Sequence, residues 1–244
     1  MPNPPIRVHE LGVCDSTQDE LRALAAAGAP AYTAERADVQ RAGRGRRGRT
    51  WEASPGTALL VSVLLRPQRP RHELPALSLA GGIATVECAR AFGADAWLSW
   101  PNDVVCEDRK LAGVLAELGP AGTVLLGVGM NLAAQVPDLP AGGRLAPTSL
   151  VLETGAAPTA SDALTTLLQA LRLLAELFDA DGPAAIAARA RPLDALEGRA
   201  VQLRLAGGEV VEGTAAGIAD DGSLLVRAGD GVRGYASGEV ARLS

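Results

Sequence analysis

The sequence is poor in several residue types that carry common catalytic and structural chemistries. Its 244 residues include three cysteines and two histidines, and only 3% are aromatic. Cys14, Cys88 and Cys106 show no Cys-x-x-Cys spacing, so we expect neither a zinc site nor a disulfide framework, and a reducing, cytoplasmic location is favoured. His9 and His72 stand apart from the polar motifs described below, so we expect chemistry without a histidine general base.

Long hydrophobic runs and a strong positive charge are missing as well. Apolar stretches such as Ala58–Val61 are far too short to span a bilayer, so no membrane association is expected. The net charge of −5 argues against a broad surface for DNA or another polyanion. Of the 23 basic residues 22 are arginine, and Lys110 is the one lysine. The chain does have 48% hydrophobic residues, enough for one large domain with a small appendix.

Apolar periodicity predicts an α+β fold in which helices pack on a mixed sheet. A helix is expected to begin near Ser16, because Ser16 and Asp19 fit the capping-box pattern. Further helices are predicted over Leu74–Phe92, which contains the unfavourable pair Gly81-Gly82, and over Asp162–Phe178 and Ala184–Ala190. Strands are predicted over Leu59–Leu65, Trp97–Trp100, Val104–Cys106, Leu111–Leu118 and Thr123–Leu132.

The pattern changes near the C-terminal end. From Gly198 onward, short alternating strands are separated by turn signals such as Gly207-Gly208 and Asp221-Gly222. Five short strands in this stretch predict a small barrel of SH3-like size. We therefore expect a larger domain over residues 1–194 and the barrel over residues 195–244.

An arginine- and glycine-rich loop is the first segment suited to chemistry. Five of its residues, within positions 41–49, are arginines: Arg41, Arg44, Arg46, Arg47 and Arg49. Glycines let backbone N–H groups face an anion, and guanidinium groups match carboxylate and phosphate oxygens. Repulsion among the charges predicts a loop that stays mobile until an anion binds. A solvated segment that binds RNA is the alternative, since such compositions bind nucleic acid.

The second segment is Trp100-Pro101-Asn102-Asp103 followed by Asp108-Arg109-Lys110-Leu111-Ala112-Gly113. Pro-Asn-Asp is a tight turn by itself, so a purely structural hairpin is the alternative. Lys110 favours a catalytic cation, because every other basic position is arginine and only lysine supplies a compact, strongly hydrated charge.

The third segment is Gly127-Val128-Gly129-Met130-Asn131. A lone Gly-x-Gly is weak evidence and is more often a sign of close strand packing. Asn102 and Asn131 each close an apolar strand, and we expect both to face a ligand.

Together these segments resemble the biotin protein ligase family. The resemblance rests on Asp15-Ser16-Thr17-Gln18, the loop Gly43–Trp51 and the Trp100–Gly113 segment, and it extends over nearly the whole chain through Gly127–Asn131, Thr148-Ser149-Leu150 and the barrel. It implies a catalytic domain of the class II synthetase type. It also implies a two-step reaction, in which biotin and Mg²⁺-bound ATP give biotinyl-5′-adenylate and pyrophosphate. The adenylate then acylates a lysine of a biotin carboxyl carrier protein or domain that belongs to a carboxylase.

The resemblance also implies roles for individual residues. Lys110, Arg44 and Arg46 would be catalytic, because they offset repulsion between the biotin carboxylate and the ATP phosphates. Biotin would be bound by Ser16, Thr17, Gln18, Gln40, Arg44, Gly45, Arg46 and Lys110. The nucleotide would be bound by Gly43, Arg46, Arg49, Trp51, Asn102 and Asn131. No protein residue is assigned to Mg²⁺, and closure of the loop would exclude water from the mixed anhydride.

The sequence departs from the family pattern at two positions. The family usually has asparagine where this chain has Gln18, and lysine where it has Ser99, which removes one supporting cation near Lys110. Some members carry an N-terminal winged helix-turn-helix and act as repressors. Only fifteen residues precede Ser16, so we expect a ligase without repressor function and without DNA as a partner. The oligomeric state is left open, a homodimer included.

Three rival functions are kept. A lipoate ligase or octanoyltransferase shares the catalytic fold and is separated by competition between biotin and lipoate. A nucleic-acid-binding module would use the arginine loop and the barrel, and would show salt-sensitive binding. A catalytically inactive carrier-binding protein would not turn over ATP.

Overall fold

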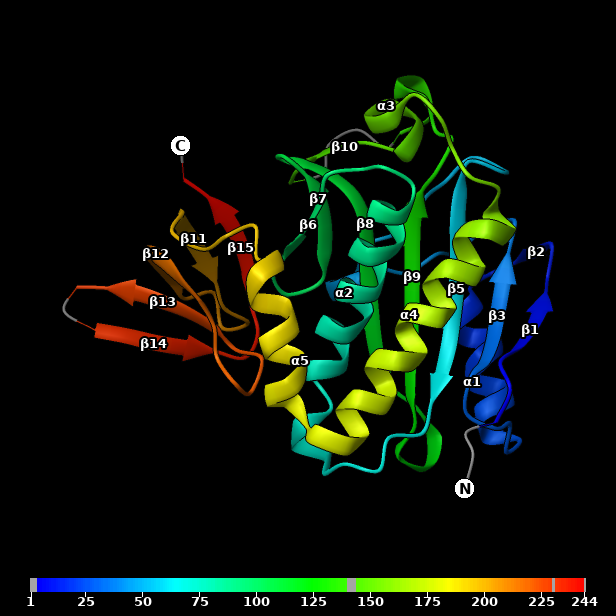
Figure 1. Cartoon of the computed structure of the whole chain (residues 1–244), viewed down its shortest axis with the longest axis horizontal. Helices are drawn as coiled ribbons and strands as arrows, with labels where there is room; N and C mark the ends of the chain where they lie inside the picture. The colour runs from blue at the N-terminus through cyan, green and yellow to red at the C-terminus, as the bar shows by residue number, and fades with distance from the viewer. Residues whose placement is uncertain (1–3, 140–143, 230, 244) are drawn as a thin grey trace.

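The computed structural model describes residues 4–139, 144–229 and 231–243 of the chain. An eight-stranded mixed sheet forms its larger part, in the order β1-β3-β5-β9-β8-β7-β6 with β10 beside β8 (Figure 1). β1 is parallel to β3 and β10 to β8, and the other neighbours are antiparallel. The strands are β1 (Arg7–Glu10), β3 (Thr33–Ala37), β5 (Ala58–Leu65), β6 (Ala96–Ser99), β7 (Asp103–Cys106), β8 (Arg109–Leu118), β9 (Val124–Asn131) and β10 (Ala146–Pro147).

Helices cover both faces of this sheet. On one face lie α2 (Ala76–Ala91) and α4 (Ala160–Asp181), with α5 (Pro183–Ala190) beside α2 (Figure 1). On the opposite face α1 (Thr17–Ala26) packs through Leu21 and Ala25 against Leu64 and Leu125. Because β5 is covered on both faces, all of its residues are buried, and it follows the continuous apolar run of a central strand.

The glycine pair in α2 permits close packing between helix and sheet. A Cβ at Gly81 would come within 2.8 Å of Val114 Cγ1, and one at Gly82 within 2.5 Å of Leu98 Cδ1. The helix is buried nearly all round, since the sheet lies on one side and α4 and α5 on the other. The two glycines that weaken the helix in sequence terms are therefore required by its packing.

The C-terminal strands form a second sheet, antiparallel throughout, in the order β14-β13-β12-β11-β15. Trp100 Nε1 donates a hydrogen bond to the Gly222 carbonyl at 3.0 Å, and Arg191 Nε donates to the Ile218 carbonyl at 2.7 Å. Buried residues of both sheets belong to one hydrophobic cluster. The strands are β11 (Ala200–Arg204), β12 (Val210–Ile218), β13 (Leu224–Ala228), β14 (Gly231–Tyr235) and β15 (Glu239–Arg242). The predicted fold class is confirmed, and the division at residue 194 stays a prediction.

The predicted elements are present with shifted ends. α1 has Ser16 at its N-cap position, but the Ser16 side chain makes no capping hydrogen bond, so the capping-box prediction is wrong. α2 begins at Ala76 rather than Leu74, after a 3-10 turn over Arg71–Glu73. α4 extends the predicted helix at both ends. Among the helices of the described ranges, none combines the length and apolar character needed to cross a bilayer.

Candidate active site

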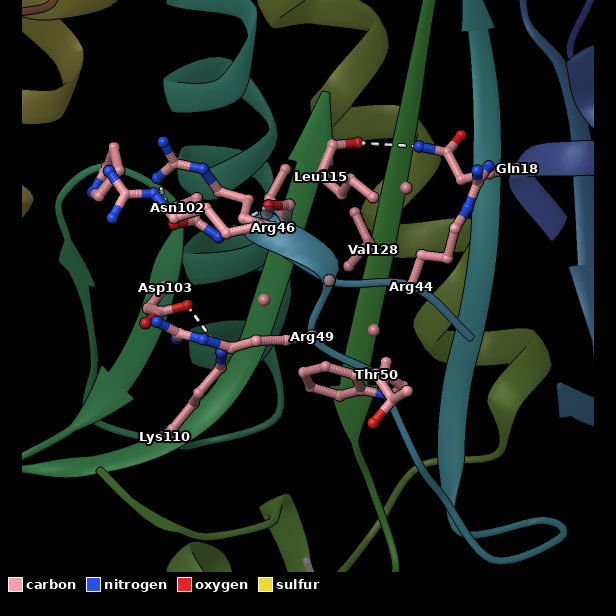
Figure 2. A pocket seen from close by; sticks show the side chains of 18 of the residues that line it. Gln18, Arg44, Arg46, Arg49, Thr50, Asn102, Asp103, Lys110, Leu115 and Val128 are labelled. Carbon is pink, nitrogen blue, oxygen red and sulfur yellow. Dashed lines mark hydrogen bonds and ion pairs between the residues drawn. The ribbon is translucent and has the colours of Figure 1, made fainter. Parts of the chain in front are cut away.

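A pocket of about 110 Å³ lies where β5, β8 and β9 pass the N-terminus of α1. The Arg/Gly loop (residues 43–51), which contains the 3-10 turn Arg46–Gly48, forms one wall, and the start of β15 forms another. Figure 2 shows Gln18 approaching from the α1 side, Arg46 on the loop, and Lys110 and Asp103 facing one another. Segments distant in the sequence are thus brought together over the centre of the main sheet.

Glycines of β8 and β9 make room for an aromatic ring in this pocket. A Cβ at Gly129 would fall within 2.7 Å of Trp51 Cδ2, and one at Gly113 within 3.2 Å of Trp51 Cζ3. At Gly127 a Cβ would lie 3.3 Å from the Gln18 carboxamide. The Gly-x-Gly pattern of β9 therefore reflects close approach by side chains that line the pocket.

The N-terminus of α1 is fixed by a side chain from the root of the loop. Gln40, in the short strand β4 (Val39–Gln40), accepts hydrogen bonds at Oε1 from Thr17 N at 2.8 Å and from Thr17 Oγ1 at 3.0 Å. Thr17 Oγ1 also lies 2.8 Å from Ser62 Oγ. β4 pairs in parallel with β2 (Val13–Cys14), which leads into α1. Gln40 thus accepts the first free N–H of α1, that of Thr17, while the Asp19 N–H donates to the Ser16 backbone carbonyl at 3.0 Å.

Three buried polar atoms of this pocket have no hydrogen-bond partner among the residues that the structure describes. They are Ser16 Oγ, Gln18 Oε1 and Trp51 Nε1. The Gln18 amide is held in place because its Nε2 donates to the Leu115 carbonyl at 3.2 Å and the Leu125 carbonyl at 3.4 Å. Buried polar atoms are normally hydrogen-bonded, so an acceptor, a donor and a hydroxyl left unpaired in one pocket indicate a polar ligand.

A carboxylate holds the lysine on the pocket wall. Lys110 Nζ lies 2.8 Å from Asp103 Oδ1 and 5.6 Å from the centre of a Trp51 ring. Arg144 Nη2 lies 3.2 Å from Asp103 Oδ2. Ser99 stands opposite Asp103 in the pairing of β6 and β7 and brings no positive charge to it. The second cation at the Asp103 carboxylate is instead Arg144.

The loop arginines divide into two groups by their partners. Arg46 donates to the Asn102 side-chain oxygen at 3.0 Å, and burial, followed by the charges of Arg47 and Arg49, lowers the pKa of its guanidinium. The other loop cations pair with carboxylates: Arg44 with Asp19 and Glu117, and Arg47 and Arg49 with Glu239. Arg46 is therefore the loop cation best suited to receive an anion from a ligand.

Most of the predicted site residues line this pocket, and two lie outside its lining. Gly43 joins the two ends of the loop, because its carbonyl accepts a hydrogen bond from Trp51 N at 2.9 Å. Asn131 is buried, and its Nδ2 donates to the Thr148 carbonyl at 2.8 Å. The lining residues that the sequence analysis did not select include Ser62, Asp103, Arg144 and Glu239. Asp103 lies inside the motif that drew attention to Asn102, whereas the other three have no local signal.

The described residues do not supply a ready metal site or a reactive thiol. No group of three or more His, Cys, Asp or Glu side chains among them could hold an ion. Asp103, the carboxylate nearest Lys110, already pairs with two cations. Burial raises the pKa of the Cys14 thiol to about 11 and those of Cys88 and Cys106 to about 12, so these cysteines are inert near neutral pH.

Comparison with known proteins gives one consistent family. Residues 12–131 match the Biotin/lipoate A/B protein ligase family, and residues 198–243 match the Biotin protein ligase C terminal domain. The chain is 35% identical over 237 residues to the Biotin--[acetyl-CoA-carboxylase] ligase of Mycobacterium tuberculosis, covering 93% of this chain and 86% of that protein. It is 33% identical over 210 residues to the Bifunctional ligase/repressor BirA of Escherichia coli. That match covers 84% of this chain and 64% of BirA, so the chain spans just under two thirds of that relative.

Solved structures are similar over nearly the full length. The biotin protein ligase from Aquifex aeolicus in complex with biotin and ATP has a TM-score of 0.84 at 26% identity, covering 97% of this chain and 98% of that chain. The biotin protein ligase from Leishmania major in complex with biotinyl-5-AMP has a TM-score of 0.58 at 26% identity, covering 99% of this chain and 100% of that chain. Both similarities include the main sheet and the C-terminal sheet.

Proposed function

Because the chain belongs to the biotin/lipoate A/B protein ligase family, we propose that it is an ATP-dependent biotin protein ligase. In the first step, a carboxylate oxygen of biotin attacks the α-phosphorus of ATP, and the bond to the β-phosphate breaks to release pyrophosphate. In the second step, the ε-amine of a lysine on a biotin carboxyl carrier domain attacks the acyl carbon of the adenylate. AMP leaves, and the amine loses a proton as the amide forms.

The observation that carries this proposal is the set of unpartnered atoms beside a cationic wall. Gln18 Oε1 can accept a hydrogen bond, Trp51 Nε1 can donate one and the Ser16 hydroxyl can do either, which suits the N–H and C=O groups of a ureido ring. Arg46 and Lys110 line the same pocket. A ligand with a neutral polar ring and a carboxylate tail satisfies both sets of groups.

The chain's own residues contribute mainly charge and position. Bringing a carboxylate to a phosphate requires two anions to approach, and Arg46 and Lys110 reduce that repulsion and stabilise charge on the transferring oxygens. Asp103 keeps the Lys110 ammonium directed along the wall. Mg²⁺ is expected to arrive on the ATP phosphates and to neutralise part of their charge, since a dedicated cluster of protein ligands is missing from the described residues.

A lipoate ligase is the second candidate, because the matched family includes lipoate ligases. The dithiolane ring of lipoate offers no N–H or C=O group to the three unpartnered atoms. Leaving such buried groups unpaired costs affinity, so the pocket favours biotin.

Nucleic-acid binding is less well supported. Arg44, Arg47 and Arg49 are paired with carboxylates of the same chain, which reduces the charge they can offer to phosphates. The expected lack of repressor function, the cytoplasmic location and the homodimer alternative stay predictions. A gel shift with DNA across salt concentrations tests the first of these.

Purified protein incubated with biotin, ATP and Mg²⁺ is expected to form biotinyl-5′-adenylate and an equal amount of pyrophosphate. Mass spectrometry of the nucleotide products and a coupled pyrophosphate assay measure the two. Lipoate in place of biotin serves as the matched control and is expected to give little product. Absence of adenylate at saturating biotin would refute the proposed activity. Preferential use of lipoate over biotin would instead identify the protein as a lipoate ligase.

A further inference from the structure

The Arg/Gly loop makes its outer contacts with the C-terminal sheet. Glu239, the first residue of β15, places one carboxylate oxygen 3.6 Å from Arg47 Nη1, and its other oxygen accepts a hydrogen bond from Arg49 Nη2. Glu239 also lines the pocket. One carboxylate therefore joins two loop arginines to a strand that lies far away in the sequence.

The loop conformation needs such a contact. Arg46, Arg47 and Arg49 are like charges within four positions, and burial, followed by the charges of Arg47 and Arg49, lowers the pKa of the Arg46 guanidinium. Arg47 has φ +57° and ψ +39°, a left-handed conformation that residues with a Cβ rarely adopt. Pairing Arg47 and Arg49 with one carboxylate offsets this repulsion and holds the turn.

The strand that carries Glu239 is itself fixed to the wall of the pocket. Arg242 donates to the Ala195 carbonyl at 2.8 Å and forms an ion pair with Asp108. The Val240 carbonyl accepts from Arg144, which also reaches Asp103. β15, which carries Glu239, is therefore held in place by hydrogen bonds and an ion pair to the segments around it.

We propose that Glu239 is a positioning residue that latches the Arg/Gly loop over the pocket, so that the C-terminal sheet helps to retain the acyl-adenylate. The inference rests on the proposed function for its ligand but not for the latch itself. Arg46 donates to the Asn102 side-chain oxygen and forms no ion pair within the described ranges, so it stays available to the ligand while Arg47 and Arg49 hold the loop. Loss of the latch leaves the pocket residues of α1 and of the main sheet in place and releases the loop that covers them.

Limited trypsin digestion tests the latch without any ligand, since trypsin cleaves after arginine. Glu239→Gln keeps the size of the side chain and is expected to raise cleavage within residues 44–49 by roughly tenfold relative to cleavage at other arginines. Glu209→Gln, at an exposed position in the turn between β11 and β12, is the matched control and should cleave like the parent protein. Equal loop cleavage in the parent and Glu239→Gln would overturn the proposal. Arg49→Gln provides a second variant, expected to expose the loop with Glu239 intact.

Retention of the intermediate is measured with biotin, ATP and Mg²⁺ in the absence of carrier. The parent protein is expected to give a burst of pyrophosphate and then slow release, because the adenylate stays bound. Glu239→Gln is expected to raise the steady rate of pyrophosphate release several-fold and to release adenylate into solution. A parent protein that forms no adenylate refutes the proposed function and leaves the digestion result to decide the latch. If the parent protein forms adenylate and Glu239→Gln releases no more of it into solution than the parent does, the role in retention is refuted.

Discussion

Lys110 is singled out both by the composition of the sequence and by its position in the structure. Its position as the one lysine among 23 basic residues predicts a catalytic cation, and the structure places it on the pocket wall. Its partners, Asp103 and the Trp51 ring, come from β7 and from the loop. Those contacts depend on how β7 and β8 pair and on how the loop folds back, so composition identifies the residue but not what holds it.

Lys110→Arg is expected to keep the fold and to lower the rate of adenylate formation by about 100-fold or more, the typical cost of losing one well-placed charge. A guanidinium is larger than an ammonium and would meet the Trp51 ring and Gly113, whose Cβ position lies 3.3 Å from Lys110 Nζ. Single-turnover kinetics measure the rate, and thermal unfolding checks the fold.

Arg109→Lys is the control for this change. Arg109 is the exposed neighbour of Lys110, and it pairs with Glu153 away from the pocket. Its replacement is expected to leave the rate near that of the parent protein. A Lys110→Arg variant that matches this control would show that the ammonium has no special role.

At the scale of elements, the long periodic segments are predictable and the close contacts are not. The leucine stripe of α4 and the apolar run of β5 identify both elements from sequence alone. The predicted capping bond of α1 is missing, because the Asp19 N–H donates to the Ser16 backbone carbonyl and the Gln40 side chain from β4 accepts from Thr17 N. The capping-box pattern involves only residues close in sequence, so it does not show that Gln40, which lies 23 positions away from Thr17, holds the start of α1.

Gly129→Ala is expected to weaken ligand binding and to lower the free energy of unfolding by about 1–3 kcal/mol, the usual cost of overpacking. The added methyl group would collide with the Trp51 ring over β9. Gly207→Ala, where nothing lies near the Cβ position, is the matched control. Urea unfolding and ligand titration give both quantities.

A double-mutant cycle identifies the cause of that loss. In a Trp51→Ala background the alanine at position 129 has room, so its added cost in unfolding free energy should largely disappear. The same cost in both backgrounds would mean that the strand itself, and not the ring, requires glycine.

At the scale of the whole molecule, the site depends on contacts between the two sheets. Glu239 and Arg144 reach the pocket wall from segments with no motif of their own, and each also contacts a residue of another segment. Sequence patterns indicate which residues share a helix or strand, but they do not show that a C-terminal strand contacts a loop near residue 47. This part of the candidate site therefore required the structure.

Asp194 makes the junction between the sheets sensitive to pH. Burial raises the pKa of its carboxyl from 3.8 to about 6, and the charge of Glu197 adds to the shift, while the Leu196 N–H acts in the opposite sense. The folded chain holds this proton more tightly than the unfolded chain, so Asp194 lowers stability as pH rises from about 4 to 6, and the full penalty remains above pH 6.

Asp194→Asn is expected to remove that penalty, because the amide stays neutral and its oxygen can still accept from Leu196 N. The gain in unfolding free energy at pH 8 is at most about 3 kcal/mol and should be smaller at pH 5. Urea unfolding at the two pH values measures it, with exposed Asp181→Asn as the control. An equal effect at both pH values would contradict the assignment.

The contacts between Gln40, Thr17 and Ser62 also fix which way the protons point. Thr17 donates its N–H and its hydroxyl proton to Gln40 Oε1, so the 2.8 Å contact between Thr17 and Ser62 uses the Ser62 proton. Ser62 then offers only lone pairs to the pocket. A ligand with an N–H group facing Ser62 Oγ gains a hydrogen bond. A ligand with an ether oxygen at the same place is repelled, because neither oxygen has a proton to donate. The hydrogen-bonding character of Ser62 is thus set by the side-chain amide of Gln40, just before the loop.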